Sequence, residues 1–278
     1  MCCATYLCMT NRTSGFRVIE CTLPRAVIPH TAVELFREGR CMDRESSGSG
    51  DGFRQRLRHT LGLDSCNTDH GVPDAVEAAI KAVRSYVEDD FTGAAFDRFG
   101  HNDPVGITSD DLIAVTMLSI HIRERSTSSL RPSSILALES LTDRITDLLG
   151  QVPADRELHT LAPDEFERWL SPGSPSDELY WLLRKGAAMP RVAVYKLLAR
   201  KRLLLMPIRD TVVERALGQS QGEWWRPWWE ALTTDPEMVS RLAQIRHRSG
   251  ADHLSLVRVA DIVLWMTHRP SEKNHEKG

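Results

Sequence analysis

The chain has 278 residues, of which 41% are hydrophobic and 26% charged, and its formal net charge at pH 7 is −3. This composition is typical of a folded globular protein and excludes wholesale disorder. The net charge excludes a protein that coats nucleic acid through its overall charge, so any such binding must come from a local basic patch. No apolar run approaches the roughly 20 residues needed to cross a bilayer, so we expect no membrane partner.

Residues 1–70 are expected to form an irregular or flexible N-terminal extension. They hold all six cysteines and the segment ESSGSGDG at 45–52, which is typical of a flexible linker. The cysteine spacings fit no zinc-ligand pattern, so we expect no metal and no cofactor. No secretory signal precedes them, which favours reduced thiols and a cytoplasmic location. Met42 is an alternative start of the protein; otherwise the extension is real but poorly packed.

Residues 73–269 are predicted to form a multi-helix all-α domain, because strand signals are nearly absent. The first helix, in residues 73–91, has an apolar stripe at three- and four-residue spacings formed by Val76, Ile80, Val83 and Val87. A turn follows, and then a helix capped by Thr108 or Ser109. One further helix is predicted over 133–150, closed by Gly150 and Pro153.

The second half of the domain continues as short helices with brief loops, which is typical of an all-α fold. These helices are predicted over 164–170, 177–186, 191–202, 210–218, 235–250 and 253–269. Apolar residues surround most of the last helix, which predicts a buried position. Residues 270–278 are expected to form a frayed tail.

Residues 184–218 concentrate nine Lys or Arg and only two acids. A turn between two helices can aim unpaired backbone N–H groups at a phosphate while nearby cations neutralise it, so this segment predicts DNA-backbone binding. The expected contacts are Arg184, Lys185, Arg191, Lys196, Arg200, Lys201 and Arg202. Alternatively, some of these cations only cover a solvated face, since the same helix also has an apolar side.

Five motifs follow one another within residues 73–269: FDRFGHNDP, ITSDDLIAVTMLSI, YKLLARKR, PIRDTVV and SLVRVADIVLWMTHR. In these motifs the chain resembles an uncharacterised actinobacterial domain family with no assigned activity. That resemblance therefore implies a family but no function.

Residues 179–218 resemble the helix-hairpin-helix DNA glycosylase superfamily. AAMPRVAVYKLLA takes the place of the hairpin, and PIRDTVVERALG takes the place of the aspartate segment. The resemblance implies that Asp210 is the catalytic aspartate, which stabilises positive charge developing on a sugar as its base departs or orients the attacking water. Alternatively, Asp210 is a helix N-cap or the ion-pair partner of Arg209 or Arg215.

The segment also departs from the superfamily pattern. Ala188 and Pro190 stand where the hairpin glycines belong; Pro190 has no N–H to offer, and positive φ is costly for Ala188. Val192 stands where the lyase-competent members have a nucleophilic lysine. No cysteine follows Cys66, which excludes the iron–sulfur loop of some members. The resemblance is therefore to a monofunctional, metal-free enzyme at most.

Four tryptophans cluster in GEWWRPWWE: Trp224, Trp225, Trp228 and Trp229. Aromatic side chains can stack on unpaired bases. Alternatively, these tryptophans wedge into the helical core around Pro227 or form a homodimer contact.

Three functions stay open on the sequence alone. The first is DNA-backbone binding through a degenerate helix-hairpin-helix-like element. The second is a monofunctional DNA glycosylase-like enzyme that uses Asp210. The third is a non-enzymatic protein-interaction domain.

Overall fold

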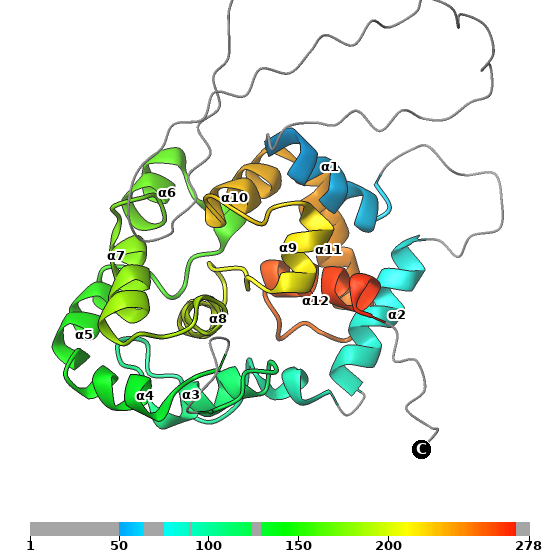
Figure 1. Cartoon of the computed structure of the whole chain (residues 1–278). Coiled ribbons are helices and arrows are strands. Elements are labelled where there is room, and N and C mark those ends of the chain that lie inside the picture. The colour runs from blue at the N-terminus through cyan, green and yellow to red at the C-terminus, as the bar shows by residue number, and fades with distance from the viewer. Residues whose placement is uncertain (1–49, 64–74, 89–90, 124–128, 271–278) are drawn as a thin grey trace, which may run out of the picture. The chain divides into compact units, whose positions relative to one another are not determined.

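The computed structural model describes residues 50–63, 75–88, 91–123 and 129–270 (Figure 1). Within them are twelve α-helices, two short 3₁₀ turns and no β-strand, and one isolated bridge pairs Ile122 with Leu130. The prediction of an all-α domain is confirmed. No helix in this part of the chain combines the length and the apolar character that a bilayer-spanning segment requires.

Helix α1, Gly50–Thr60, lies within the segment that the sequence suggested would be irregular. Phe53, Leu57 and Leu61 are buried and recur every four residues, so they form the core-facing side of a helix that packs against α9 and α10. The helical fold therefore includes residues 50–63 of the predicted extension. The rest of the predicted extension that falls in residues 1–49, and the tail 271–278, lie outside the described residues.

Helices α2, Ala75–Glu88, and α3, Ser109–Thr116, form where the apolar stripe and the cap predict them. The Thr108 hydroxyl accepts a hydrogen bond from the Asp111 amide at 3.4 Å, and the Asp111 carboxylate accepts one from the Thr108 amide at 2.9 Å. This reciprocal pair satisfies two amides that the start of a helix leaves unpaired. Thr108 is therefore the cap.

The single helix predicted over 133–150 is two helices, α4, Pro132–Glu139, and α5, Thr142–Gly150. Their junction holds two hydroxyls that donate to the last carbonyls of α4: Ser140 Oγ to Ala137 O at 2.8 Å, and Thr142 Oγ1 to Glu139 O at 3.0 Å. Such bonds compete with the backbone amides that would continue the helix. Hydroxyl competition therefore accounts for a break that the apolar pattern alone does not reveal.

Six of the following helices agree with the prediction apart from small differences in their ends, and the seventh, α10, was not predicted as a helix. They are α6, Pro163–Trp169; α7, Pro175–Trp181; α8, Arg191–Lys201; α9, Thr211–Leu217; α10, Trp225–Thr234; α11, Pro236–Arg248; and α12, Leu256–His268. Helix α7 runs on into one π-helical turn, Leu182–Gly186, before the chain turns into α8. Helix α10 contains the tryptophan cluster.

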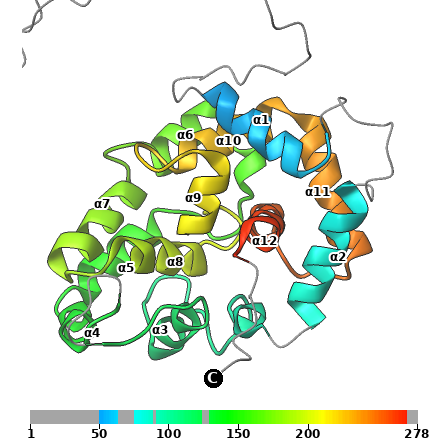
Figure 2. The ribbon, with the colours of Figure 1, turned by 45° about the vertical axis from the view of Figure 1, so that its right-hand side comes forward.

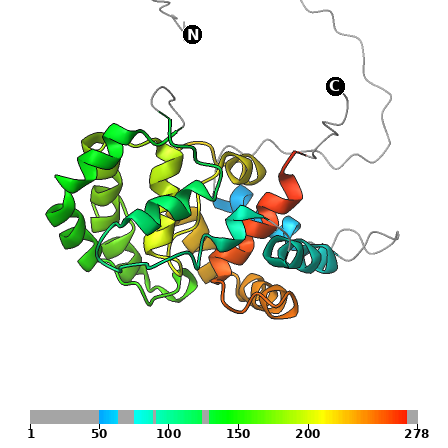
Figure 3. The same cartoon turned by 90° about the horizontal axis from the view of Figure 1, so that it is seen from below.

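Helix α12 lies at the centre of one group of helices. Every residue from Leu256 to Leu264 is buried, as the apolar pattern predicts. Helices α2, α9 and α11 pack against it, and Figures 2 and 3 show α2 and α11 beside it. An all-round apolar helix is stable only when neighbours cover all its faces.

Helix α8 is the buried helix of a second group, in which α3 and α7 pack against it (Figure 2). Its residues from Ala193 onward are all buried, including the cations at its end. Arg200 and Lys201 share the fully buried carboxylate of Asp111, at 3.4 Å and 2.8 Å. Lys201 also donates to the Asn102 side chain at 2.7 Å. The acid that closes the α3 cap therefore also pairs with two cations at the end of α8.

Arg202, directly after α8, is buried without a carboxylate partner among the described residues. Its guanidinium donates to the carbonyls of Val152 at 2.9 Å, Pro104 at 2.9 Å and Lys201 at 2.7 Å, and also to Leu149 O. Burial lowers the pKa of Arg202 to about 10, which leaves it charged at neutral pH. This one side chain ties the end of α5 and the loop before α3 to α8.

We predict that Arg202→Met destabilises the protein by at least about 2 kcal/mol, because it leaves several buried carbonyls without a donor. Arg168→Met, at an exposed arginine of α6, is the control and changes stability by less than about 0.5 kcal/mol. Urea unfolding measures both. Equal midpoints for the two variants would contradict the role given to Arg202.

Candidate functional site

Four of the seven cations expected to contact DNA are inside the protein. Lys196, Arg200, Lys201 and Arg202 are 4%, 1%, 3% and 2% exposed, and their charged groups bond to internal acceptors. A phosphate contact requires a cation at the surface. The cations at the end of α8 therefore stabilise the fold in this conformation. They form neither an exposed basic surface nor a solvated helix face.

The other three predicted cations reach the surface to different degrees. Lys185 is exposed, and its ammonium lies 4.5 Å from the centroid of the Trp181 ring. Arg191 is 37% exposed in its side chain and pairs with Glu214 at 2.9 Å. Arg184 is half-buried and donates to Met189 O. Of the seven cations in the predicted basic surface, these three are the ones that reach solvent.

The turn between the π-helical turn and α8 uses its amides internally. The amides of Ala187 and Met189 donate to Leu182 O at 3.2 Å and Leu183 O at 3.1 Å. Ala188 has a φ of 51°, in the left-handed region where the sequence suggested an alanine would be costly. Two amides of the turn are therefore committed within the chain rather than aimed at a ligand.

Asp210 caps helix α9. Its Oδ1 accepts the Val212 amide at 2.9 Å, so the capping alternative holds. Its Oδ2 lies 3.2 Å from the ammonium of Lys196, which also donates to Leu118 O at 2.6 Å. The ion-pair partner is thus Lys196, and neither Arg209 nor Arg215 is paired with Asp210. The Asp210 side chain is 20% exposed, so the carboxylate is held at both oxygens and is still partly open to solvent.

Asp210 lies in the wall of a cavity of about 270 Å³, which we call the Asp210 cavity. The wall is formed by the end of α2, the segment after it, the loop after α3, Lys196 of α8, the start of α9 and one side of α12. The cavity therefore lies where the helix group around α8 meets the group around α12. Its volume is near the lower end of the range for ligand pockets, roughly 300–1,000 Å³.

Three aromatic rings form one side of the Asp210 cavity. Tyr86 and Phe91 are stacked, with centroids 5.6 Å apart and planes 12° apart. The Trp265 ring stands nearly perpendicular to both, with centroids 6.2 Å from Tyr86 and 6.1 Å from Phe91. Such a corner of flat apolar surfaces suits a planar ligand.

A buried ionic network forms the other side of the Asp210 cavity. Arg258 pairs with Asp97 at 3.0 Å, donates to the Tyr86 hydroxyl at 2.9 Å, and pairs with Asp261 one turn along α12. Burial alone would lower the pKa of Arg258, but Asp97, Tyr86 and Asp261 raise it overall. The arginine is therefore a fixed positive charge behind the cavity wall.

Two groups in this wall have pKa values displaced toward neutrality. Burial raises the pKa of Asp261 to about 7, against the opposing effect of Arg258, and the charge of Asp210 adds to the rise. Burial lowers the pKa of Lys196, although Asp210 opposes this. Displaced pKa values of this kind cluster at functional sites.

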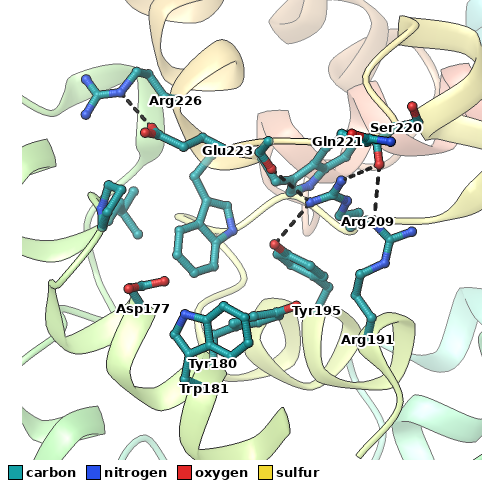
Figure 4. A pocket seen from close by; sticks show the side chains of 15 residues that line it. Asp177, Tyr180, Trp181, Arg191, Tyr195, Arg209, Ser220, Gln221, Glu223 and Arg226 are labelled. Atoms are coloured by element: carbon teal, nitrogen blue, oxygen red, sulfur yellow. Dashed lines mark hydrogen bonds and ion pairs between the residues drawn. The ribbon is translucent and has the colours of Figure 1, made fainter. Parts of the chain in front are cut away.

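A second cavity, of about 350 Å³, lies beside α10, and we call it the tryptophan cavity (Figure 4). Three aromatic residues lie together around the cavity, Tyr180, Trp181 and Tyr195, and two arginines lie beside them, Arg191 and Arg209. Arg209 is 4% exposed in its side chain and is held by Glu214, the Tyr195 hydroxyl and Ser220 O. Because the donors of Arg209 already have partners within the chain, the tryptophan cavity is a weaker candidate for a reactive site than the Asp210 cavity.

The structure places the tryptophan cluster in the core, as the wedge alternative expects. Trp224, Trp225 and Trp228 are 2%, 7% and 0% exposed, and Trp229 is half-buried and stacked on Phe166 at 4.6 Å. Neither base stacking nor a dimer contact is open to the three buried rings in this conformation. The exposed indole is that of Trp181, at 46%, a residue outside the GEWWRPWWE segment.

Sequence reasoning also missed Tyr86, Arg258 and Asp261. The available signal was a charged pair, Arg258 and Asp261, three residues apart in a helix whose other faces are apolar. Such charges must be paired or functional when the helix is buried. Of the predicted site residues, the structure brings together Asp210 and Lys196, and none of the others lines the Asp210 cavity.

The molecule is thus an all-helical protein with a cavity that is aromatic on one side and ionic on the other. It belongs to DUF6308, a family of unknown function whose model matches residues 79–268. No curated protein matches the chain, and no solved structure matches it. The matched range contains every cavity residue described above, and the family assigns no role to any of them.

We predict a pH dependence of stability that is specific to Asp261. Between about pH 4 and pH 7 the folded protein binds a proton at Asp261 that the unfolded chain has released, so this group's contribution to stability falls as pH rises. Asp261→Asn removes this contribution. The free energy of unfolding of the wild type minus that of Asp261→Asn should therefore fall, by on the order of 1 kcal/mol or more, between pH 5 and pH 8.

Urea unfolding of the two proteins at several pH values measures this difference. A difference that is constant or rises with pH would contradict the raised pKa of Asp261.

Proposed function

We propose that this protein is a monofunctional glycosylase-like hydrolase that cleaves the N-glycosidic bond of a nucleobase held in the Asp210 cavity. The observation that supports the proposal most is the position of Asp210. Its carboxylate is fixed by the start of α9, is partly open, and lies in the wall of a cavity lined by Tyr86, Phe91 and Trp265.

The chemistry needs one negative charge near the sugar and a flat pocket for the base. As the carbon–nitrogen bond breaks, its electron pair leaves with the base and the sugar becomes positively charged. The Asp210 carboxylate stabilises that charge. Water then adds its oxygen to the sugar carbon and gives up a proton, and the departing base nitrogen gains one.

The neighbours of Asp210 suit this role. Lys196 and the Val212 amide each hold one oxygen of the carboxylate, at 3.2 Å and 2.9 Å, so its orientation is set before a substrate arrives. The aromatic rings supply stacking surfaces, which every base can use.

DNA is the substrate class that the helix-hairpin-helix resemblance implies. Its phosphate contacts would come from Arg184, Lys185 and Arg191, because the remaining predicted cations are buried. Val192, in place of the nucleophilic lysine, favours base removal without strand cleavage.

We predict that the purified protein releases free base from oligonucleotides carrying uracil, hypoxanthine or an alkylated base, and that Asp210→Asn lowers the rate at least about 100-fold. Asparagine is as good an N-cap as aspartate, so the variant loses the charge while α9 keeps its cap. Chromatography of the released base measures the rate.

The matched control is Asp235→Asn. Asp235 caps α11 by accepting the Met238 amide at 3.1 Å, and it does not line the Asp210 cavity. Its variant should retain the wild-type rate. Equal rates for Asp210→Asn and the wild type would remove Asp210 from the mechanism. DNA binding without release of any base would leave a DNA-binding function and overturn the hydrolysis.

A further inference from the structure

The tryptophan cavity is larger than the Asp210 cavity, at about 350 Å³ against about 270 Å³. Its volume falls within the range of small-molecule sites. Of the aromatic residues that line it, Tyr180 is half-buried and Trp181 is 46% exposed, and the others are buried. Two rings of this wall are therefore accessible to a ligand.

The Trp181 indole is the most exposed aromatic side chain of the wall. The Tyr180 ring meets it at 79°, with centroids 5.1 Å apart, and the Lys185 ammonium lies 4.5 Å from its centroid. Lys185 is exposed and has a flexible stem, so its ammonium can leave the indole face and bind an anion beside the ring. An open ring next to a movable cation suits a flat ligand that carries negative charge.

Positive charge exceeds negative charge on the side of this cavity where Arg191 and Arg209 lie (Figure 4). Both arginines pair with a single carboxylate, that of Glu214, which leaves one positive charge over. Lys185, above the Trp181 ring, adds a second. This end of the cavity therefore favours an anionic group.

Arg191 still has donors for such a group. Its Nη2 donates to Glu214 Oε2 at 3.0 Å, and its Nη1 lies 2.9 Å from Glu214 Oε1 and 3.4 Å from Ser220 O. These contacts use at most three of the five N–H groups of a guanidinium. Because its side chain is 37% exposed, the remaining N–H groups can donate to a phosphate. Arg209, which is 4% exposed, supplies charge without contact.

The acids of the cavity wall lie at its other end (Figure 4). They are Asp177 and Glu223, and Glu223 pairs with Arg226 at 2.8 Å. Arg226 also pairs with Glu167 at 3.0 Å, so acids outnumber bases at this end. A ligand that has a negative group at one end and N–H donors at the other matches both ends of the cavity. A phosphate joined to a nucleobase with an amino group has this pattern.

We infer that the tryptophan cavity binds a nucleotide, with its base against Trp181 and Tyr180 and its phosphate on Arg191 and Lys185. A free nucleotide and an unpaired nucleotide of a single strand share this chemistry. The cavity has no lining residue in common with the Asp210 cavity. The inference uses two cations that the proposed function assigns to phosphate contacts, but it needs no bond to be cleaved.

Three probes separate the contributions of the base and the phosphate. AMP carries both, adenosine lacks the phosphate and ribose 5-phosphate lacks the base. Titration calorimetry at pH 7 and low salt should show AMP binding at least about tenfold more tightly than either of the others, because a charge-assisted hydrogen bond and a stacked base each contribute about that factor or more. Equal affinities for the three probes, or no binding of AMP, would overturn the inference.

Trp181→Leu removes the stacking ring at a position that is nearly half exposed, so the fold should survive and AMP affinity should fall about tenfold or more. A variant that binds AMP like the wild type would overturn the inference and place the nucleotide elsewhere.

Lys185→Gln tests the phosphate contact and should weaken AMP binding at least about threefold while leaving adenosine binding unchanged. Lys81→Gln is the matched control, since Lys81 is an exposed lysine of α2 that does not line the cavity. The control should bind AMP like the wild type. Equal losses in the two variants would contradict a local contact at Lys185.

Oligonucleotides distinguish the two sources of the nucleotide. If the site serves a single strand, a ten-residue oligodeoxyadenylate should bind more tightly than AMP, and Trp181→Leu should weaken both. If it serves a free nucleotide, the oligonucleotide should gain nothing over AMP. In either case pairing the oligonucleotide with its complement should remove the dependence on Trp181, because the bases of a duplex are stacked on one another. A dependence on Trp181 that persists in the duplex would overturn the inference.

The base-release assay gives separate outcomes. Asp210→Asn should bind AMP like the wild type, because Asp210 does not line the tryptophan cavity. Nucleotide binding that depends on Trp181, without any base release, would support this site and contradict the hydrolase. Base release by a protein that does not bind AMP would do the reverse.

Discussion

The burial of the cations at the end of α8 is the constraint on which the rest of this structure depends. Arg200 and Lys201 share the buried carboxylate of Asp111, and Arg202 has only carbonyls for partners. Removing one partner from such a set leaves an uncompensated charge or carbonyl, which is far more costly than losing a surface ion pair. These bonds fix α8 against α3 and the end of α5. A fixed α8 in turn places Lys196 beside Asp210.

The Asp210 cavity follows from this arrangement together with the burial of α12. Helix α8 contributes Lys196 to the cavity wall, and helix α12 contributes Arg258 and Asp261. Each buried helix therefore places charged side chains in the wall between the two groups of helices. The charges are paired closely enough to be tolerated, yet one carboxylate oxygen of Asp261 is left without a donor. The cavity thus combines an aromatic wall with a few charged groups, as small-molecule sites do.

Local signals predicted most of the helices and the caps at Thr108 and Asp210, because caps and apolar stripes depend on residues only a few positions apart. The fate of the basic segment could not be predicted in the same way, since its burial depends on Asp111 and Asn102, about 90 to 100 positions earlier in the chain. The cavity depends on still longer separations, such as the 172 positions between Tyr86 and Arg258. A charge pattern shows where cations are, and only tertiary packing decides whether they face water.

The chemical reactivity of individual lysines tests the central claim most directly. Lys196 and Lys201 are buried and bonded to acids, whereas Lys81 on α2 and Lys185 after α7 are exposed. Limited acetylation of the native protein, followed by peptide mass spectrometry, measures the four rates against those in the unfolded chain. The structure predicts that Lys81 and Lys185 react readily while Lys196 and Lys201 become reactive only on unfolding. Equal native rates for all four lysines would contradict a buried α8 and, with it, the cavity built on that helix.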